Sequence, residues 1–280
     1  MWYNLSMNVL IVGNVLKDVY LRLDERHNDF EYDESDKPWL DLCFDGSTHP
    51  FFRRNSVYGG AAVTLEVVKK FGLTGQISGS KLGMEDANEV GKSDNYRYIL
   101  CYDDHISYFT SSQRTPTIFT TPDDTIDWIM IDRSANINDQ FVKDVSALMS
   151  VSNQTKLAVY VKDQPEMLYN QLIELADVVF TEGELKPLHS QQQVCTIHDE
   201  AISLDDEKQE WHLPHKDLLT HLTAHSIIAA SLLSALILEK STHEALKLAK
   251  LNVENATLDR TMSLEKLEEL IYKTNNPFCA

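Results

Sequence analysis

The residues best suited to do chemistry stand directly before an apolar helical segment in the last third of the chain. They read Thr223-Ala224-His225-Ser226, and the segment behind them runs from Ile227 to Leu238. The first amides of a helix lack intrahelical partners and, together with the helix dipole, attract anions such as phosphate. A histidine such as His225 is the right type of residue for a general base, whereas a serine hydroxyl is not. The pattern therefore favours an anion site at this helix start.

The neighbouring histidines raise the question of a metal site. His221 and His225 stand four residues apart, and His212 and His215 are also close in sequence. Structural zinc sites usually add cysteine ligands, and no C-x-x-C pair occurs in this chain. We therefore expect surface or helix-start histidines and no metal ion.

The elements that must position these residues alternate between strands and helices. Short apolar runs predict buried strands at residues 8–12, 128–131, 157–161, 178–180 and 194–197. Helical periodicity predicts helices at residues 140–149 and 166–175, at 245–251 after the capping box Ser241–Glu244, and at 263–273. Gly59-Gly60 opens one more helix, which Gly72 closes. Such alternation indicates parallel strands joined by crossover helices.

Two zones depart from this pattern and read as antiparallel β ribbon. The first covers residues 19–58, where Val19 to Leu23 alternates in polarity, and the second has strand candidates at residues 96–102, 106–109 and 117–120. No linker of low complexity separates the pieces. We therefore expect one α/β domain over residues 1–280, with lid segments at about 19–58 and 96–120.

The amino-acid composition limits the classes of partner that the protein can bind. The chain has 280 residues with Lys+Arg 25 and Asp+Glu 43, a net charge of −18, which argues against nucleic acid and against an anionic membrane surface. The cysteines (Cys43, Cys101, Cys195 and Cys279) are scattered, as expected for reduced thiols in the cytosol. No signal-like or bilayer-length apolar run is present in the sequence. We expect a cytoplasmic protein.

The order of motifs along the chain resembles that of the PfkB/ribokinase family of carbohydrate and nucleoside kinases. The similar segments are Val12–Asp18, Gly59–Ala62 with its helix to Gly72, Gly79 with Gly83–Asp86, Ala176–Glu182, and the helix pair containing Leu232–Leu236, Lys240–Ser241 and Glu244–Leu246. This resemblance implies a ribokinase-like three-layer α/β sandwich with a mostly parallel central sheet and a small β-stranded lid. It also implies ATP and magnesium as cofactors, and a sugar or sugar-phosphate hydroxyl as the acceptor.

The same resemblance assigns roles to individual residues. Those implied to bind substrate are Asn14, Asp18, Gly59 and Gly60. Those implied to lie beside the nucleotide or phosphate are Glu182, Thr196, Thr223, Ala224 and Lys250. Ser226 takes the position of the family's catalytic aspartate, and His225 takes that of the second glycine of its Gly-Ala-Gly-Asp motif.

The departures from the family pattern are concentrated on the reacting side. A serine at position 226 removes general-base assistance worth roughly 10²–10⁴-fold. The family asparagine after Gly59-Gly60 falls on Val63 or Thr64, and its Asn-x-x-Glu motif becomes Glu182-Gly183-Glu184-Leu185. Histidine in place of glycine at position 225 would also be costly if that site requires a positive φ.

Three functions remain open. The first is a weak or inactive kinase (a pseudokinase) that binds a sugar, a nucleotide-like ligand or a partner protein. The second is an active ATP-dependent sugar kinase in which His225 or a water-bound carboxylate replaces the missing base. The third is a structural protein that forms a homodimer through its lid.

Overall fold

The structure, a computed structural model, divides the chain into two compact units. The larger comprises Met1–Asn14, Gly60–Ser80 and Pro116–Ala280, and the smaller comprises Val15–Gly59 and Lys81–Thr115. The residues that it describes are 7–23, 40–44, 47–78, 96–102, 105–110, 117, 119, 125–152, 154–162, 167–213, 221–257 and 261–275. The motif at Gly79 and residues 83–86 lies outside them. A single domain with lid segments at about 19–58 and 96–120 stays a prediction.

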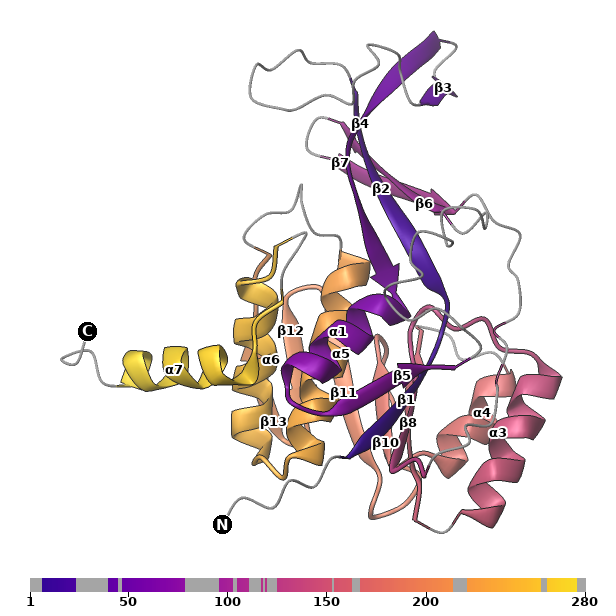
Figure 1. Cartoon of the computed structure of the whole chain (residues 1–280), viewed down its shortest axis with the longest axis vertical. Helices are drawn as coiled ribbons and strands as arrows, with labels where there is room; N and C mark the ends of the chain where they lie inside the picture. The colour runs from indigo at the N-terminus through magenta and orange to yellow at the C-terminus, as the bar shows by residue number, and fades with distance from the viewer. Residues whose placement is uncertain are drawn as a thin grey trace. The chain divides into compact units, whose positions relative to one another are not determined.

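Among the described residues, the larger unit is built on an eight-stranded sheet in the order β13-β12-β11-β10-β9-β8-β1-β5 (Figure 1). The strands are β1 (Asn8–Val12), β5 (Thr74–Ile77), β8 (Trp128–Ile131), β9 (Lys156–Val161), β10 (Val178–Thr181), β11 (Gln193–His198), β12 (Ala201–Leu204) and β13 (Glu207–Glu210). Neighbours from β11 to β5 pair in parallel, and β12 and β13 add antiparallel pairs at one edge. The predicted mostly parallel sheet is confirmed.

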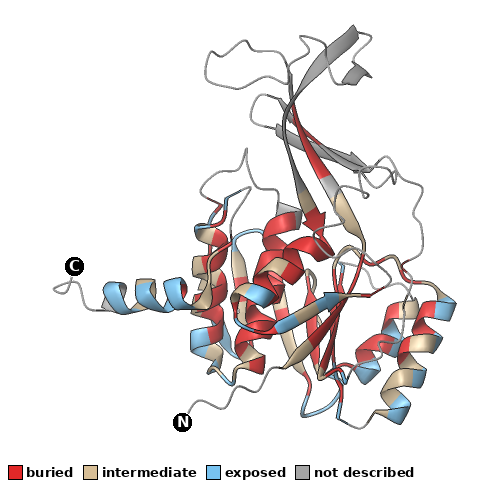
Figure 2. Ribbon diagram, viewed as in Figure 1, coloured by how far each residue is buried: buried red, intermediate tan, exposed pale blue. Residues whose placement is uncertain are grey.

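Helices cover both faces of this sheet, because its central strands are apolar on both sides. The described helices are α1 (Ala61–Lys70), α3 (Asp139–Val151), α4 (Met167–Leu175), α5 (His221–Ile237), α6 (Thr242–Glu254) and α7 (Leu264–Asn275). In β1, Val9 and Ile11 belong to one core with α1, α5 and α6, while Leu10 and Val12 belong to a second core with α3 and α4. Figure 2 shows the buried residues along the strands and on the helix faces turned toward them. The three-layer architecture is confirmed.

Local sequence signals account for several helix starts. Ser241 Oγ accepts a hydrogen bond from the Glu244 amide, and the Glu244 carboxylate accepts one from the Ser241 amide, so the predicted capping box is present. At α3, the Asn138 side chain accepts a hydrogen bond from the Phe141 amide at 2.8 Å. None of the helices described is long and apolar enough to cross a membrane.

The smaller unit contains a five-stranded sheet in the order β3-β4-β2-β6-β7. Its strands are β2 (Val15–Leu23), β3 (Leu40–Phe44), β4 (Ser47–Gly60), β6 (Tyr96–Tyr102) and β7 (His105–Thr110). The pairs β3–β4 and β6–β7 are antiparallel as predicted, but β2 and β6 run parallel. An antiparallel ribbon throughout was therefore a wrong expectation. The reason is tertiary, since the partner of β2 is a strand far along the chain.

Two further expectations about these zones need correction. Val19, Tyr20 and Leu21 are all buried, so β2 is not an exposed alternating strand over these residues. Thr117 and Phe119 lie outside any strand, although residues 117–120 were predicted to form one. Residues 118 and 120 lie outside the described part of the chain.

Candidate functional site

Polar side chains gather at the carboxyl ends of the parallel strands in the larger unit. Asp132 and Arg133 follow β8, Tyr160 stands near the end of β9, Glu182 follows β10, and Asp199 follows β11. In open α/β sheets, ligands bind outside these strand ends, above all where the strand order reverses. Here the reversal falls between β1 and β8, because the chain extends the sheet to β5 on one side of β1 and then returns to β8 on the other. This edge is the candidate site.

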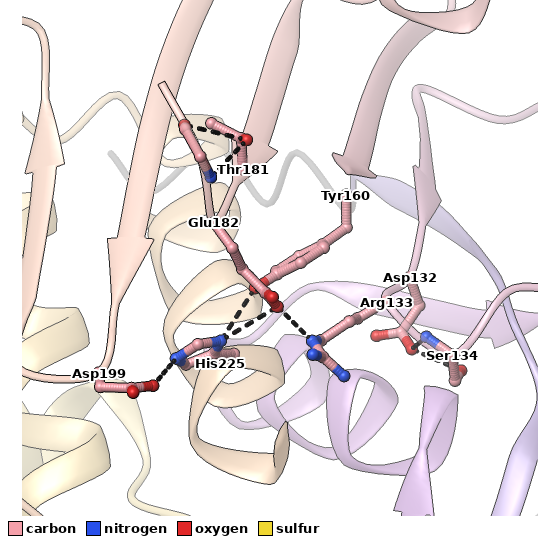
Figure 3. A network of polar contacts seen from close by, with 9 residues as sticks. Asp132, Arg133, Ser134, Tyr160, Thr181, Glu182, Asp199 and His225 are labelled. Carbon is pink, nitrogen blue, oxygen red and sulfur yellow. Dashed lines mark hydrogen bonds and ion pairs between the residues drawn. The ribbon is translucent and has the colours of Figure 1, made fainter. Parts of the chain in front are cut away.

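Arg133, Tyr160 and His225 converge on one carboxylate oxygen, Oε1 of Glu182 (Figure 3). Arg133 Nε donates to it at 2.5 Å, the Tyr160 hydroxyl donates at 3.0 Å, and His225 Nδ1 lies 3.3 Å away. The Tyr160 hydroxyl and His225 Nδ1 are themselves 3.2 Å apart. Because these side chains come from β9, α5 and the ends of β8 and β10, the network joins four elements at the edge of the sheet.

The electrostatics of this network favour an ionised glutamate. Burial would raise the pKa of Glu182, but the hydrogen bonds from His225 and Arg133 and the positive charge of Arg133 outweigh it and hold that pKa at about 2. Burial, reinforced by the negative charge of Glu182, raises the pKa of Tyr160 well above its ordinary value. The Tyr160 phenol therefore remains a hydrogen-bond donor, and the charge of Arg133 is balanced within the chain.

The opposite side of the His225 ring faces a second acid. His225 Nε2 lies 3.6 Å from Asp199 Oδ1, an ion-pair distance that is too long for a hydrogen bond. Trp211 packs edge-on against the imidazole, with 6.1 Å between ring centroids, and its indole donates to the His198 carbonyl at 3.1 Å. His225 is only 5% exposed. It is a buried histidine in the first turns of α5, so of the two expected positions, surface or helix start, it takes the helix start.

The helix that carries Thr223–Ser226 begins earlier than predicted. α5 starts at His221, so the segment lies within its first turns and is buried. Each helical amide beyond the first turn bonds to the carbonyl four residues earlier. The amides of His225 and Ser226 are therefore inside the ladder and do not form an open helix start. His225 has no positive φ, so the strain expected from replacing glycine does not arise.

A second polar cluster lies at the reversal point between β1 and β8. Asp132 is 1% exposed and accepts hydrogen bonds from Thr64 Oγ1 at 2.5 Å and from the Ser134 amide at 2.8 Å. Asn14 Nδ2 in turn donates to the Ser134 carbonyl at 3.1 Å. Gly60 has φ 62, and a Cβ there would lie 2.3 Å from the Asn14 carbonyl oxygen, so glycine is required. Asn14 and Gly60, both predicted to bind substrate, are thus brought together.

The other predicted substrate residues meet within the smaller unit. Asp18 lies in β2 and is 0% exposed, so its carboxylate is buried within a strand. A Cβ on Gly59 would lie 2.3 Å from Asp18 Oδ2. Glycine at position 59 therefore lets the backbone pass beside a buried carboxylate. A substrate role for Asp18 and Gly59 stays a prediction.

Two residues predicted on the nucleotide side do not join the network around Glu182. Thr196 sits in β11 opposite Thr181 on one side and Ser203 on the other. Lys250 lies in α6 and forms an ion pair with Glu254 at 3.9 Å. Their roles, like those of Thr223 and Ala224, stay predictions. Within the described ranges, no group of three or more His, Cys, Asp or Glu side chains could hold a metal ion.

Several residues of these clusters were not predicted from sequence, among them Asp132, Arg133 and Tyr160. A signal was available, because Asp132 and Arg133 directly follow a predicted strand at 128–131 and Tyr160 lies near the end of another at 157–161. Polar residues at such positions meet at one edge of a parallel sheet. The family motifs lie at other positions in the sequence and therefore did not indicate these residues.

Comparisons with known proteins bear on the fold. No protein-family model and no curated protein matches the sequence. Among solved structures, a nucleoside kinase of Methanocaldococcus jannaschii, described as an archaeal member of the ribokinase family, superposes with a TM-score of 0.61 at 14% identity, over 95% of this chain and 98% of that one. Arabidopsis thaliana ribokinase complexed with ribose and ATP gives 0.60 at 13% identity, over 95% of this chain and 99% of that one.

A third match is a nucleoside kinase of Burkholderia thailandensis in complex with inosine, with a TM-score of 0.59 at 11% identity, over 97% of this chain and 99% of that one. These matches span nearly all of each chain, although few residues are identical. Structural similarity at such low sequence identity is evidence for the fold alone. The chain therefore has the ribokinase-like fold, as the order of its motifs predicted.

Proposed function

We propose that this protein is a carbohydrate-kinase-like binding protein that takes a sugar or nucleoside and does not transfer phosphate efficiently. The observation that carries the proposal is the state of the first turns of α5. Ser226, at the position of the base, is buried inside the helix, and the neighbouring His225 imidazole is held by Glu182 and Tyr160. Neither side chain is placed to act as a general base toward a substrate hydroxyl.

The chemistry of a kinase makes this arrangement unfavourable. A general base must lie within hydrogen-bond reach of the hydroxyl that it deprotonates, and a serine cannot serve at neutral pH. His225 Nδ1 is directed at Glu182, and Nε2 is directed at Asp199. Without a base, phosphoryl transfer loses roughly 10²–10⁴-fold in rate.

Ligand binding is supported by the second polar cluster of the site. Asn14, Gly60 and the buried Asp132 form an ordered cluster at the reversal point of the sheet, where this class of fold binds its ligands. Two proteins of the same fold were solved in complex with ribose and ATP and with inosine. Ribose and inosine are polyols without phosphate, so such polyols are the first compounds to test.

Two measurements on the same protein test the proposal. We expect thermal stabilisation by at least one member of a panel of sugars and nucleosides, and no ADP formation when ATP, magnesium and that ligand are combined. Turnover in the wild type that disappears in His225→Ala, but survives in the control His243→Ala at an exposed histidine, would refute the proposal. That result would instead identify an active kinase with His225 as its base.

Absence of stabilisation by any sugar, nucleoside or nucleotide would remove both ligand-based functions. A structural role, with a homodimer formed through the β lid, would then be the remaining hypothesis. Sedimentation equilibrium of the full chain distinguishes a monomer from such a dimer.

A further inference from the structure

We infer that the Glu182 carboxylate occupies, from within the chain, an anion-binding position at the carboxyl edge of the sheet. The ligand bound there is consequently uncharged at this end, a free polyol or nucleoside and not its phosphate ester. The first statement stands on the geometry of the network alone. The second rests on the proposed function.

The groups around Glu182 Oε1 are those that proteins use to hold a phosphate or carboxylate oxygen. A guanidinium nitrogen at 2.5 Å, a phenol hydroxyl at 3.0 Å and an imidazole nitrogen at 3.3 Å surround it. They come from Arg133, Tyr160 and His225, on separate elements. Helix starts and strand ends that are far apart in sequence therefore converge on one negatively charged atom.

Each partner is restrained, so the position persists without the glutamate. Tyr160 is buried and stacks on Phe180, with 6.4 Å between ring centroids. His225 is fixed by its place in α5 and by Trp211. The Arg133 guanidinium lies over the Tyr160 ring, 5.9 Å from its centroid, and the Arg133 side chain is 16% exposed. Removal of the carboxylate would leave a cationic group and its neighbours in place.

The position is strongly selective for negative charge. The pKa of Glu182 is held at about 2 despite burial, which shows how far its surroundings favour an anion over a neutral group. In the wild-type chain this preference is satisfied internally. A phosphate group that arrives from solution must therefore displace Glu182 from Arg133, or remain outside the network next to a carboxylate that repels it.

Phosphate binding by the full chain and its variants tests the first statement. Inorganic phosphate is titrated at constant ionic strength by calorimetry and by thermal shift. Glu182→Ala should bind phosphate at least about tenfold more tightly than the wild type. The reason is that phosphate can then form the charged hydrogen bonds that the Glu182 carboxylate forms in the wild type. The matched control Glu184→Ala removes the same charge at an exposed position two residues away and should behave like the wild type.

A second variant keeps the test informative if the first variant does not fold. If Glu182→Ala does not fold, Glu182→Gln keeps the size and one oxygen but removes the negative charge that faces Arg133, and it should also gain phosphate affinity. Adding Arg133→Met to either variant should abolish the gain. The inference is overturned if the wild type binds phosphate as tightly as these variants, or if neither variant gains affinity.

The ligand class is tested separately on the wild type. Stabilisation by a free sugar or nucleoside is compared with stabilisation by its monophosphate ester at equal concentration. Tighter binding of the phosphate ester would overturn the second statement and leave the first intact. Efficient phosphoryl transfer would overturn the proposed function, whereas the phosphate titration of the variants would be unaffected by it.

Discussion

Replacing Glu182 with glutamine should destabilise the larger unit in a way that depends on pH. The change keeps the shape and removes the charge that Arg133, Tyr160 and His225 surround. A pKa lowered from 4.5 to about 2 corresponds to at most about 3 kcal/mol. Solvent screening of a group that is not fully buried reduces this, and we expect about 2 kcal/mol at pH 7.

The sign of the pH dependence follows from the direction of the shift. Because the carboxyl is more acidic in the folded state, its contribution is fully present above pH 4.5 and declines as the pH falls toward 2. Urea unfolding followed by far-UV circular dichroism between pH 7 and pH 3 measures it, since the described helices lie in the larger unit. The difference between wild type and Glu182→Gln should stay constant from pH 7 to about pH 5 and shrink below pH 4.5.

Two outcomes would refute this reasoning. One is an equal stability of Glu182→Gln and wild type at pH 7, which would mean that the network contributes nothing to folding. The other is a difference that stays constant down to pH 3, which would mean that packing, and not charge, explains it. The control Glu184→Gln at an exposed position should change the free energy of unfolding by less than about 0.5 kcal/mol at every pH.

Three further substitutions test other parts of the structure by urea unfolding. Gly60→Ala should cost more than about 2 kcal/mol, because of the positive φ and the close Asn14 carbonyl, and a neutral effect would contradict that backbone geometry. Thr64→Val removes a donor to the buried Asp132 carboxylate and should cost about 1.5–3 kcal/mol, whereas Thr64→Ser should cost less. Ser241→Ala should cost about 1 kcal/mol through loss of the α6 cap, and restoration by Ser241→Asp would confirm the capping role.

The fold could be predicted from the sequence to a large extent because its signals are local. Apolar runs such as 128–131 and 157–161 became the central strands β8 and β9, and the capping box at Ser241 starts α6 as expected. Periodicity and capping depend on neighbours in sequence, so they survive without knowledge of the tertiary contacts. The order of the motifs then sufficed to predict the three-layer α/β architecture.

The parts that were predicted wrongly depend on distant partners. The parallel pairing of β2 with β6 joins residues that are far apart in the chain, and no local pattern distinguishes it from a ribbon. The start of α5 at His221 was also missed, because the apolar run alone marks the helix only from Ile227 onward. The burial of His225 within the first turns of this helix was also not evident from the local sequence.

The candidate site shows the same division. From the sequence, the resemblance predicted that Ser226 stands at the position of the family's base and that Glu182 replaces a family asparagine. Only the tertiary structure decided that Arg133, Tyr160 and His225 close around the Glu182 carboxylate. The physical reason is that these contacts are set by the order of β8, β9 and β10 in the sheet and by the docking of α5, which no short segment of the chain encodes.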